Sequence, residues 1–187
     1  MNTYRSTDKT QLTAHFNVSE FRCRCGRNHD TKLDTDLVDK LEKLHKALGC
    51  SKIIVNSGYR CPAHDRNVGG NGSGQHTKGT AADIVCYDSK GRVISSKIVC
   101  CAAQDIGFGG IANIDGTYTA THVDVRVSKW FGDETKGDNY NIPSGDFYRH
   151  YKLSEIDVYG AAAQVKKTKA VTLTVDGVTY SGTLTEK

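Results

Sequence analysis

Two histidines and an aspartate stand in a pattern that can bind a metal ion. Six residues separate His76 from Asp83. If His76 ends a loop and Asp83 lies on the strand that follows, both side chains can reach one ion, and Gly79 permits the tight backbone between them. Further along, His122 and Asp124 are two residues apart on a stretch with strand character. Their side chains are therefore expected to project from one face of that strand.

Two imidazoles and one carboxylate make the three-ligand set of a catalytic zinc site, which leaves a fourth position for water. Zinc bound in this way lowers the pKa of the water to about 7 and polarises a substrate carbonyl. Such a site also needs a base for the proton of the water and a cation that holds the substrate. We expect His76, Asp83 and His122 to bind the metal, Asp124 to act as the base and Arg60 to act as the cation.

Each of these residues also has an ordinary structural explanation. A single His or Asp is most often solvated or hydrogen-bonded, and Arg60 can be a surface charge. Asp124 can instead be a partner that orients a metal ligand. Cys61 and His64 form a further pair that would suit a cysteine enzyme, although such a separation is common by chance. The spacing alone therefore leaves these alternatives open.

Three blocks of the sequence follow one another in a specific order and spacing: Asn56–Arg60, Gln75–Asp83 and Thr121–Asp124. Together they resemble the zinc D-Ala-D-Ala carboxypeptidases, a group that includes vancomycin-resistance dipeptidases and phage L-alanyl-D-glutamate endolysins. The hedgehog signalling domain shares the fold of this group. The similarity extends roughly from His15 to Tyr159. It implies an α+β fold, with a small, mostly antiparallel sheet and helices packed on it.

The resemblance carries over to single residues of this sequence. His76, Asp83 and His122 match the zinc ligands of the group. Arg60 matches the arginine that binds the carboxylate of the substrate or the developing oxyanion. We also expect a substrate contact from Gln75, which precedes the first ligand.

The sequence departs from the dipeptidases and endolysins at the catalytic base. Those enzymes carry a Glu three residues before the last His ligand, where this chain has Thr119, which cannot act as a base. The branch with a His-x-Asp arrangement has a different layout. Asp124 is therefore the expected base.

The resemblance implies zinc-dependent hydrolysis of peptide bonds at or beside D-Ala in the stem peptides of bacterial peptidoglycan. A D-Ala-D-Ala carboxypeptidase and a phage-type endolysin both fit. The alternative is a non-catalytic, zinc-containing binding module of the same fold, as the hedgehog domain illustrates. Arg60 together with Asp124 argues against this alternative, because a structural zinc site needs neither residue.

The hydrophobic pattern indicates the elements that position these residues. Apolar residues recur at helical spacing over residues 34–48, with Asp34 or Thr35 as the cap and Gly49 at the end. Short strands are expected over residues 52–56, 81–87, 107–111 and 119–127, and a second helix over residues 95–104. Residues 1–16 are polar and are expected to be irregular.

Length and composition fit one compact domain with a short extra segment. The chain has 187 residues, of which 37% are hydrophobic, and no apolar run approaches a membrane span. We expect a peptidase domain over residues 1–160, then a linker and a hairpin over residues 161–187, where Asp176-Gly177 is a strong turn signal. The first twenty residues lack the apolar region of a signal peptide. The protein is therefore expected to be cytoplasmic until released, or to reach the cell wall through phage lysis.

The charge of the chain does not favour a nucleic-acid partner. The net charge is +4, and the Lys and Arg residues are scattered, whereas nucleic-acid binders concentrate them in a stripe. We expect no nucleic acid or membrane as partner, and a monomer that binds the stem peptide.

The seven cysteines give no clear signal. Cys23 and Cys25 flank one arginine, and Cys100 and Cys101 are adjacent, so neither pair has the CxxC spacing of a ribbon-type zinc site. Free or buried thiols in a reducing compartment are expected, with one or two disulfides as the alternative.

Overall fold

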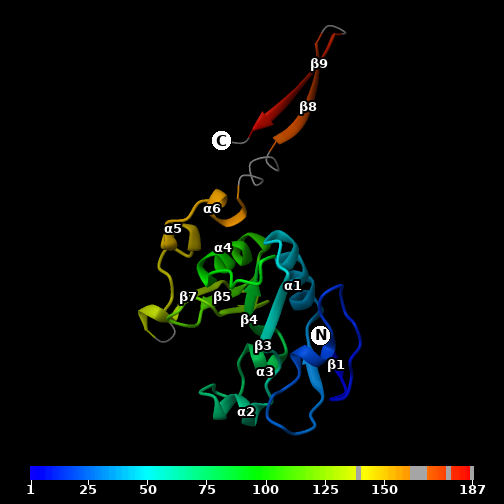
Figure 1. Cartoon of the computed structure of the whole chain (residues 1–187), viewed down its shortest axis with the longest axis vertical. Helices are drawn as coiled ribbons and strands as arrows, with labels where there is room; N and C mark the ends of the chain where they lie inside the picture. Colours follow the sequence, from blue (N-terminus) through cyan, green and yellow to red (C-terminus); the bar gives the residue numbers. More distant parts are fainter. Residues whose placement is uncertain (138–139, 161–167, 176–177, 186–187) are drawn as a thin grey trace.

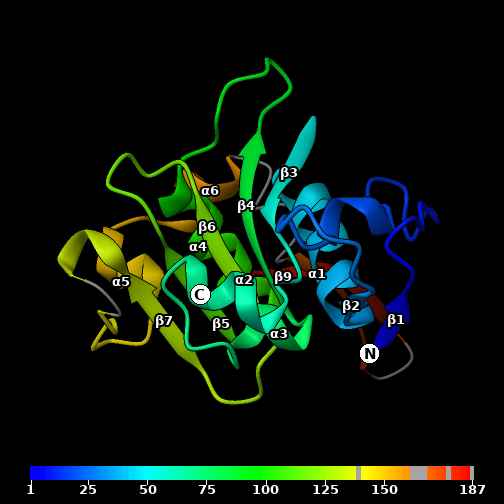
Figure 2. The same cartoon turned by 90° about the horizontal axis from the view of Figure 1, so that it is seen from below.

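The computed structural model of the protein describes residues 1–137, 140–160, 168–175 and 178–185. Its centre is a five-stranded sheet (Figure 1), and Figure 2 labels all five strands in the order β3-β4-β6-β5-β7. The strands are β3 (Lys52–Ser57), β4 (Ala81–Tyr87), β5 (Gly110–Asn113), β6 (Thr121–Asp124) and β7 (Trp130–Asp133). Neighbouring strands are antiparallel except β5 and β7, which are parallel. This confirms the predicted α+β fold with a mostly antiparallel sheet.

Two longer helices, α1 (Thr35–Ala47) and α4 (Ser96–Ile106), pack on one face of the sheet. The side chain of Asp34 caps α1 by accepting a hydrogen bond from the backbone N–H of Asp36, as the sequence predicted. Leu37 and Leu41 are fully buried in the core. The short helices α2 (Pro62–Asn67) and α3 (Gln75–Lys78) lie on the other side of the sheet, in front of it in Figure 2, where α1 and α4 lie behind it.

The alternation of side chains along β4 and β6 separates apolar from polar residues. Ile84 and Val123 belong to the core under the helices. Asp83, His122 and Asp124 occupy the alternate positions, so they project from the opposite face. Because β4 and β6 pair with Asp83 directly opposite His122, these two side chains are cross-strand neighbours.

The N-terminal segment differs from the prediction. Residues 1–16 were expected to be irregular, but β1 (Asn2–Tyr4) pairs antiparallel with β2 (Thr31–Leu33). Because β1 is short and mostly exposed, it carries no hydrophobic alternation that would reveal it in the sequence. The single-turn helix η1 (Val18–Phe21) lies between these strands in the chain, with Asn17 as its cap.

The chain continues beyond the sheet through three short helices, η2 (Glu134–Lys136), α5 (Phe147–Tyr151) and α6 (Glu155–Tyr159). Beyond these, β8 (Thr168–Val175) pairs antiparallel with β9 (Val178–Thr185). The expected linker and the Asp176-Gly177 turn lie outside the described residues, and the division into a domain and a hairpin stays a prediction. Among the described residues, no helix has the length and apolar character needed to cross a membrane.

A buried carboxylate fixes the end of β7. Asp133 is 1% exposed and accepts hydrogen bonds from His150 Nε2 at 2.7 Å and from Thr135 Oγ1 at 2.7 Å. Asn113 Nδ2 on β5 donates a further bond at 3.2 Å. Burial alone would raise the pKa of this carboxyl, but the hydrogen bonds from His150, Thr135 and Asn113 lower it to about 2. The network joins β5, β7, η2 and α5.

Replacing Asp133 with Asn should make stability less dependent on pH in acid. A folded-state pKa of about 2 lies below the ordinary value of about 3.9, so the ionised carboxylate stabilises the fold by about 2–3 kcal/mol above pH 4. This contribution is lost as the pH falls through about 2. Urea unfolding of both proteins between pH 7 and pH 2 should show a difference that shrinks towards the acid end. A difference that stays constant with pH would contradict the ionised network.

Candidate active site

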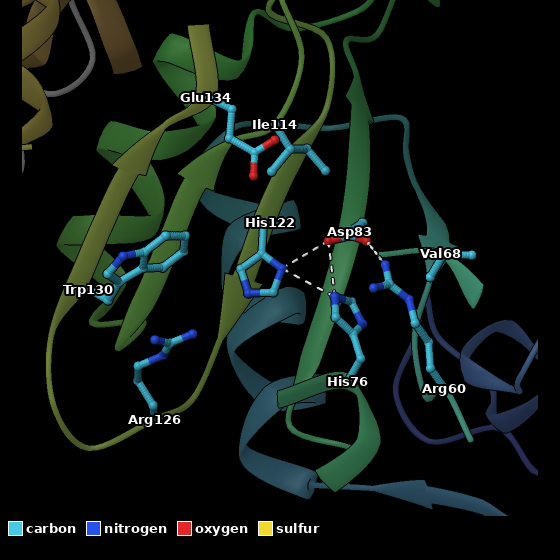
Figure 3. Close-up of a pocket in the computed structure, with 9 residues that line it drawn as sticks. All are labelled: Arg60, Val68, His76, Asp83, Ile114, His122, Arg126, Trp130 and Glu134. Carbon is cyan, nitrogen blue, oxygen red and sulfur yellow. Dashed lines mark hydrogen bonds and ion pairs between the residues drawn. The ribbon is translucent and has the colours of Figure 1, made fainter. Parts of the chain in front are cut away.

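The structure brings His76, Asp83 and His122 together on the face of the sheet opposite α1 and α4 (Figure 3). Asp83 Oδ1 lies 3.2 Å from His76 Nε2 and 2.9 Å from His122 Nδ1, and the two nitrogens are 3.3 Å apart. A tetrahedral zinc ion with bonds of about 2.0–2.1 Å has edges of about 3.3 Å between its ligand atoms. The three atoms therefore form a triangle of the size of one face of a zinc tetrahedron.

Backbone contacts fix the ring of His76. It lies on α3, a single helical turn rather than the predicted loop end. Its Nδ1 is 2.7 Å from the carbonyl oxygen of Gly58, which places the N–H there and leaves the Nε2 lone pair for a metal. Gly79 ends α3 at a φ of +77°, and a Cβ at this residue would lie 2.3 Å from the carbonyl oxygen of Lys32. Both the backbone conformation and the close approach of Lys32 require glycine at this position, as the sequence indicated.

Arg60 orients the carboxylate of Asp83. Its guanidinium bonds to Asp83 Oδ2, and its Nε donates to Ser57 Oγ at 2.8 Å. This arrangement leaves Asp83 Oδ1 for the two histidines. Burial alone would raise the pKa of Asp83, but the hydrogen bond from His122 Nδ1 holds it far below its ordinary value. Asp83 is therefore ionised and suited to bind a cation.

His122 lies between two carboxylates. Its Nδ1 contacts Asp83, and its Nε2 is 3.1 Å from Asp124 Oδ2. Burial alone would lower the pKa of His122, but Asp124 and Asp83 together raise it to about 9. The same negative surroundings favour a divalent cation in place of that proton. Gly110 makes room for this arrangement, because a Cβ there would lie 2.1 Å from the Asp124 carboxylate.

Asp124, which the sequence predicted to be the base, is buried behind His122. Its side chain is fully buried, contacts the outer nitrogen of His122 and forms an ion pair with Arg126. It is not among the residues that line the pocket over the three ligands. These contacts are those of a residue that orients a metal-binding histidine, which is the alternative that the sequence left open.

A pocket of about 390 Å³ covers the three ligands (Figure 3). It combines the ligand triad with two cations, one acid and three apolar or aromatic side chains: Arg60, Val68, His76, Asp83, Ile114, His122, Arg126, Trp130 and Glu134. Such a mixture of apolar walls and a few convergent polar groups is typical of a binding site for a small polar ligand.

Several pocket residues were missing from the sequence prediction. Arg126 continues the row of His122 and Asp124 at every second position, and that spacing could have indicated it. Trp130 and Glu134 enter from β7 and η2, where no spacing relates them to the ligands. The parallel pairing of β7 with β5 brings them to the site. The guanidinium of Arg126 lies 5.0 Å from the centre of the Trp130 ring.

Two other predicted residues lie elsewhere. Gln75 does not line the pocket, and its Oε1 accepts a hydrogen bond from Thr80 Oγ1 at 2.8 Å. A substrate contact for Gln75 stays a prediction. Cys61 is buried, and its sulfur accepts a bond from the backbone N–H of His64 at 3.4 Å. This pair lies outside the pocket of the three ligands.

Comparison with known proteins gives a family. The model of the family described as Peptidase M15 matches residues 14–124, which is more than half of the chain and includes all three predicted ligands. Among curated proteins, none matches the sequence. Members of this family are generally zinc-dependent, which agrees with the size and donor types of the His/Asp triangle. The chain therefore belongs to the peptidase M15 family of metallopeptidases.

Proposed function

We propose that the protein hydrolyses peptide bonds at or beside D-Ala in peptidoglycan stem peptides, with zinc held by His76, Asp83 and His122. The observation that carries this proposal is the triangle of one carboxylate oxygen and two imidazole nitrogens, with sides of 2.9, 3.2 and 3.3 Å, under an open pocket. Its donor set fits zinc, and the pocket leaves space for water and substrate.

The residues around the ion prepare the site for hydrolysis. When bound by three protein ligands, zinc supplies an acidic water and a Lewis acid for the scissile carbonyl. The Gly58 carbonyl holds the tautomer of His76, Asp124 holds the orientation of His122, and Arg60 holds that of Asp83. These contacts fix all three ligands before substrate arrives.

Two arginines suit an anionic peptide. Stem peptides carry free carboxylates, and Arg60 and Arg126 both line the pocket. Although Arg60 bonds to Asp83 and Ser57, a guanidinium has five N–H donors, so it can also reach a substrate carboxylate or an oxyanion. Arg60 is therefore our candidate for the group that binds the negative charge of the substrate.

Glu134 competes with Asp124 for the role of base. Figure 3 shows the Glu134 carboxylate directed into the pocket on the side of His122 that faces Ile114. Asp124, by contrast, is fully buried behind His122. A base must reach the proton of the attacking water. We therefore favour Glu134 as the base and Asp124 as the residue that orients His122.

A pair of substitutions separates these roles. Glu134→Gln should retain zinc and lower kcat by roughly 10²–10⁴-fold, because general-base catalysis contributes about that much. Asp124→Asn should weaken zinc binding by roughly 10–100-fold, and excess zinc should restore its activity. Metal titration and kcat at saturating zinc measure both effects. If Asp124→Asn instead retains zinc and loses kcat, and Glu134→Gln weakens zinc binding, Asp124 would be the base.

Digestion of purified muropeptides, followed by mass spectrometry, tests the function. A carboxypeptidase would release terminal D-Ala, whereas an endopeptidase would create a new amino group inside the stem peptide. The non-catalytic alternative expects binding to cell walls without either product. An unchanged muropeptide profile with folded, zinc-loaded protein would reject the proposal.

A further inference from the structure

A second group of potential metal ligands lies outside the pocket. The Sγ atoms of Cys23, Cys25 and Cys61 all lie within 4.8 Å of one another. Cys23 and Cys25 follow η1, whereas Cys61 directly precedes α2. Folding thus brings together three thiols from two distant segments, although neither segment has a zinc-binding spacing of its own.

Two of these sulfurs accept hydrogen bonds from backbone N–H groups. The N–H of Cys61 donates to Cys23 Sγ at 3.3 Å, and the N–H of His64 donates to Cys61 Sγ at 3.4 Å. An N–H donor directed at sulfur stabilises negative charge on it. Thiolates are the form in which cysteines bind zinc.

An imidazole lines the same hollow as two of the sulfurs. Cys25, Cys61 and His64 line one hollow of about 110 Å³, together with Arg27, Ala63 and Asn67. Three thiolates and one imidazole form a common structural zinc set. A disulfide would use two of the three sulfurs and leave the third beside them, whereas an ion uses all three. The structure describes all seven cysteines as free thiols.

We propose that Cys23, Cys25 and Cys61 bind a structural zinc ion, with His64 as the fourth ligand. Binding replaces the three thiol protons, which pass to solvent, and involves no change of oxidation state. This site is separate from the His76, Asp83 and His122 centre and does not depend on the proposed function.

The ion would connect the N-terminal segment to the loop that carries Arg60. Contacts already hold these parts together: the N–H of Tyr59 donates to the carbonyl of Phe21 at 2.7 Å. A Cβ on Gly58 would lie 2.6 Å from the Cα of Phe21. Because Gly58 and Arg60 contact His76 and Asp83, the thiolate site would stabilise the loop beside the catalytic ligands.

Metal analysis of the full chain tests the proposal. After purification with zinc, we expect two zinc ions per chain in the wild type and one each in His76→Ala and in Cys25→Ser. Cys101→Ala, which removes a buried cysteine of α4, is the matched control and should keep two. His64→Ala should weaken binding at the thiolate site and leave the sulfur ligation intact.

Cobalt substitution gives a readout that does not depend on the folding of a cysteine variant. In His76→Ala, the remaining cobalt should show the near-ultraviolet thiolate-to-metal charge-transfer band, and zinc in its place should show Zn–S distances of about 2.3 Å by X-ray absorption. A spectrum without sulfur ligation would overturn the proposal. So would one zinc per chain in the wild type that His76→Ala abolishes, or a disulfide among Cys23, Cys25 and Cys61 in freshly purified protein.

Discussion

Replacing His76 with alanine should abolish peptide hydrolysis and remove the zinc ion of the His/Asp centre. Its Nε2 is one corner of the ligand triangle. Among the described residues that line the pocket, His122 is the one other histidine, and it already occupies a second corner. A metal ion contributes several kcal/mol of transition-state stabilisation, so we expect a loss on the order of 10³-fold or more. Muropeptide turnover and cobalt spectra of the same preparation measure both effects.

His15→Ala is the matched control for this variant. The side chain of His15 is 40% exposed, lies 2.9 Å from Glu42 Oε1 and stacks on the ring of His45. None of these three residues lines the pocket over His76, Asp83 and His122. Its activity and metal content should therefore equal those of the wild type. Full activity of a His76→Ala protein without metal at this centre would contradict zinc-dependent hydrolysis at this site.

The second large effect is expected for Arg60→Lys. Lysine keeps the positive charge but lacks the planar fork that bonds Asp83 and Ser57 at once. We expect kcat/KM to fall by roughly 10²–10³-fold, similar to the removal of one oxyanion-stabilising donor. Steady-state kinetics with metal analysis should show this loss while the zinc content stays near that of the wild type.

A substrate change separates the two contributions of Arg60. If its guanidinium binds the terminal carboxylate, amidation of that carboxylate should impair the wild type but have little further effect on Arg60→Ala. If Arg60 acts by orienting Asp83 alone, amidation should impair both proteins equally. An Arg60→Lys protein with normal kinetics would show that catalysis does not need the guanidinium of this residue.

Local patterns predicted the elements that carry the three ligands. β4 was predicted over residues 81–87 because its short apolar run ends at a clear turn. The same-face relation of His122 and Asp124 follows from strand periodicity. α3 was not predicted, because a helix of a single turn is too short to show a helical period. The polar strand β1 was missed because only its pairing with β2 defines it.

The rest of the site depends on tertiary contacts. Glu134 and Trp130 reach the pocket because β7 crosses over to pair parallel with β5, and nothing in their spacing encodes that pairing. The role of Asp124 follows from its burial behind His122, which the His-x-Asp spacing does not reveal. Likewise, Cys61 joins Cys23 and Cys25 through folding alone.

Anomalous scattering at the zinc absorption edge, from crystals of the full chain, tests the central claim most directly. We predict a peak at about 2.0–2.2 Å from His76 Nε2, Asp83 Oδ1 and His122 Nδ1, with a fourth position facing the pocket. No peak at this place in crystals grown with zinc, with the three side chains turned away from one another, would contradict the account.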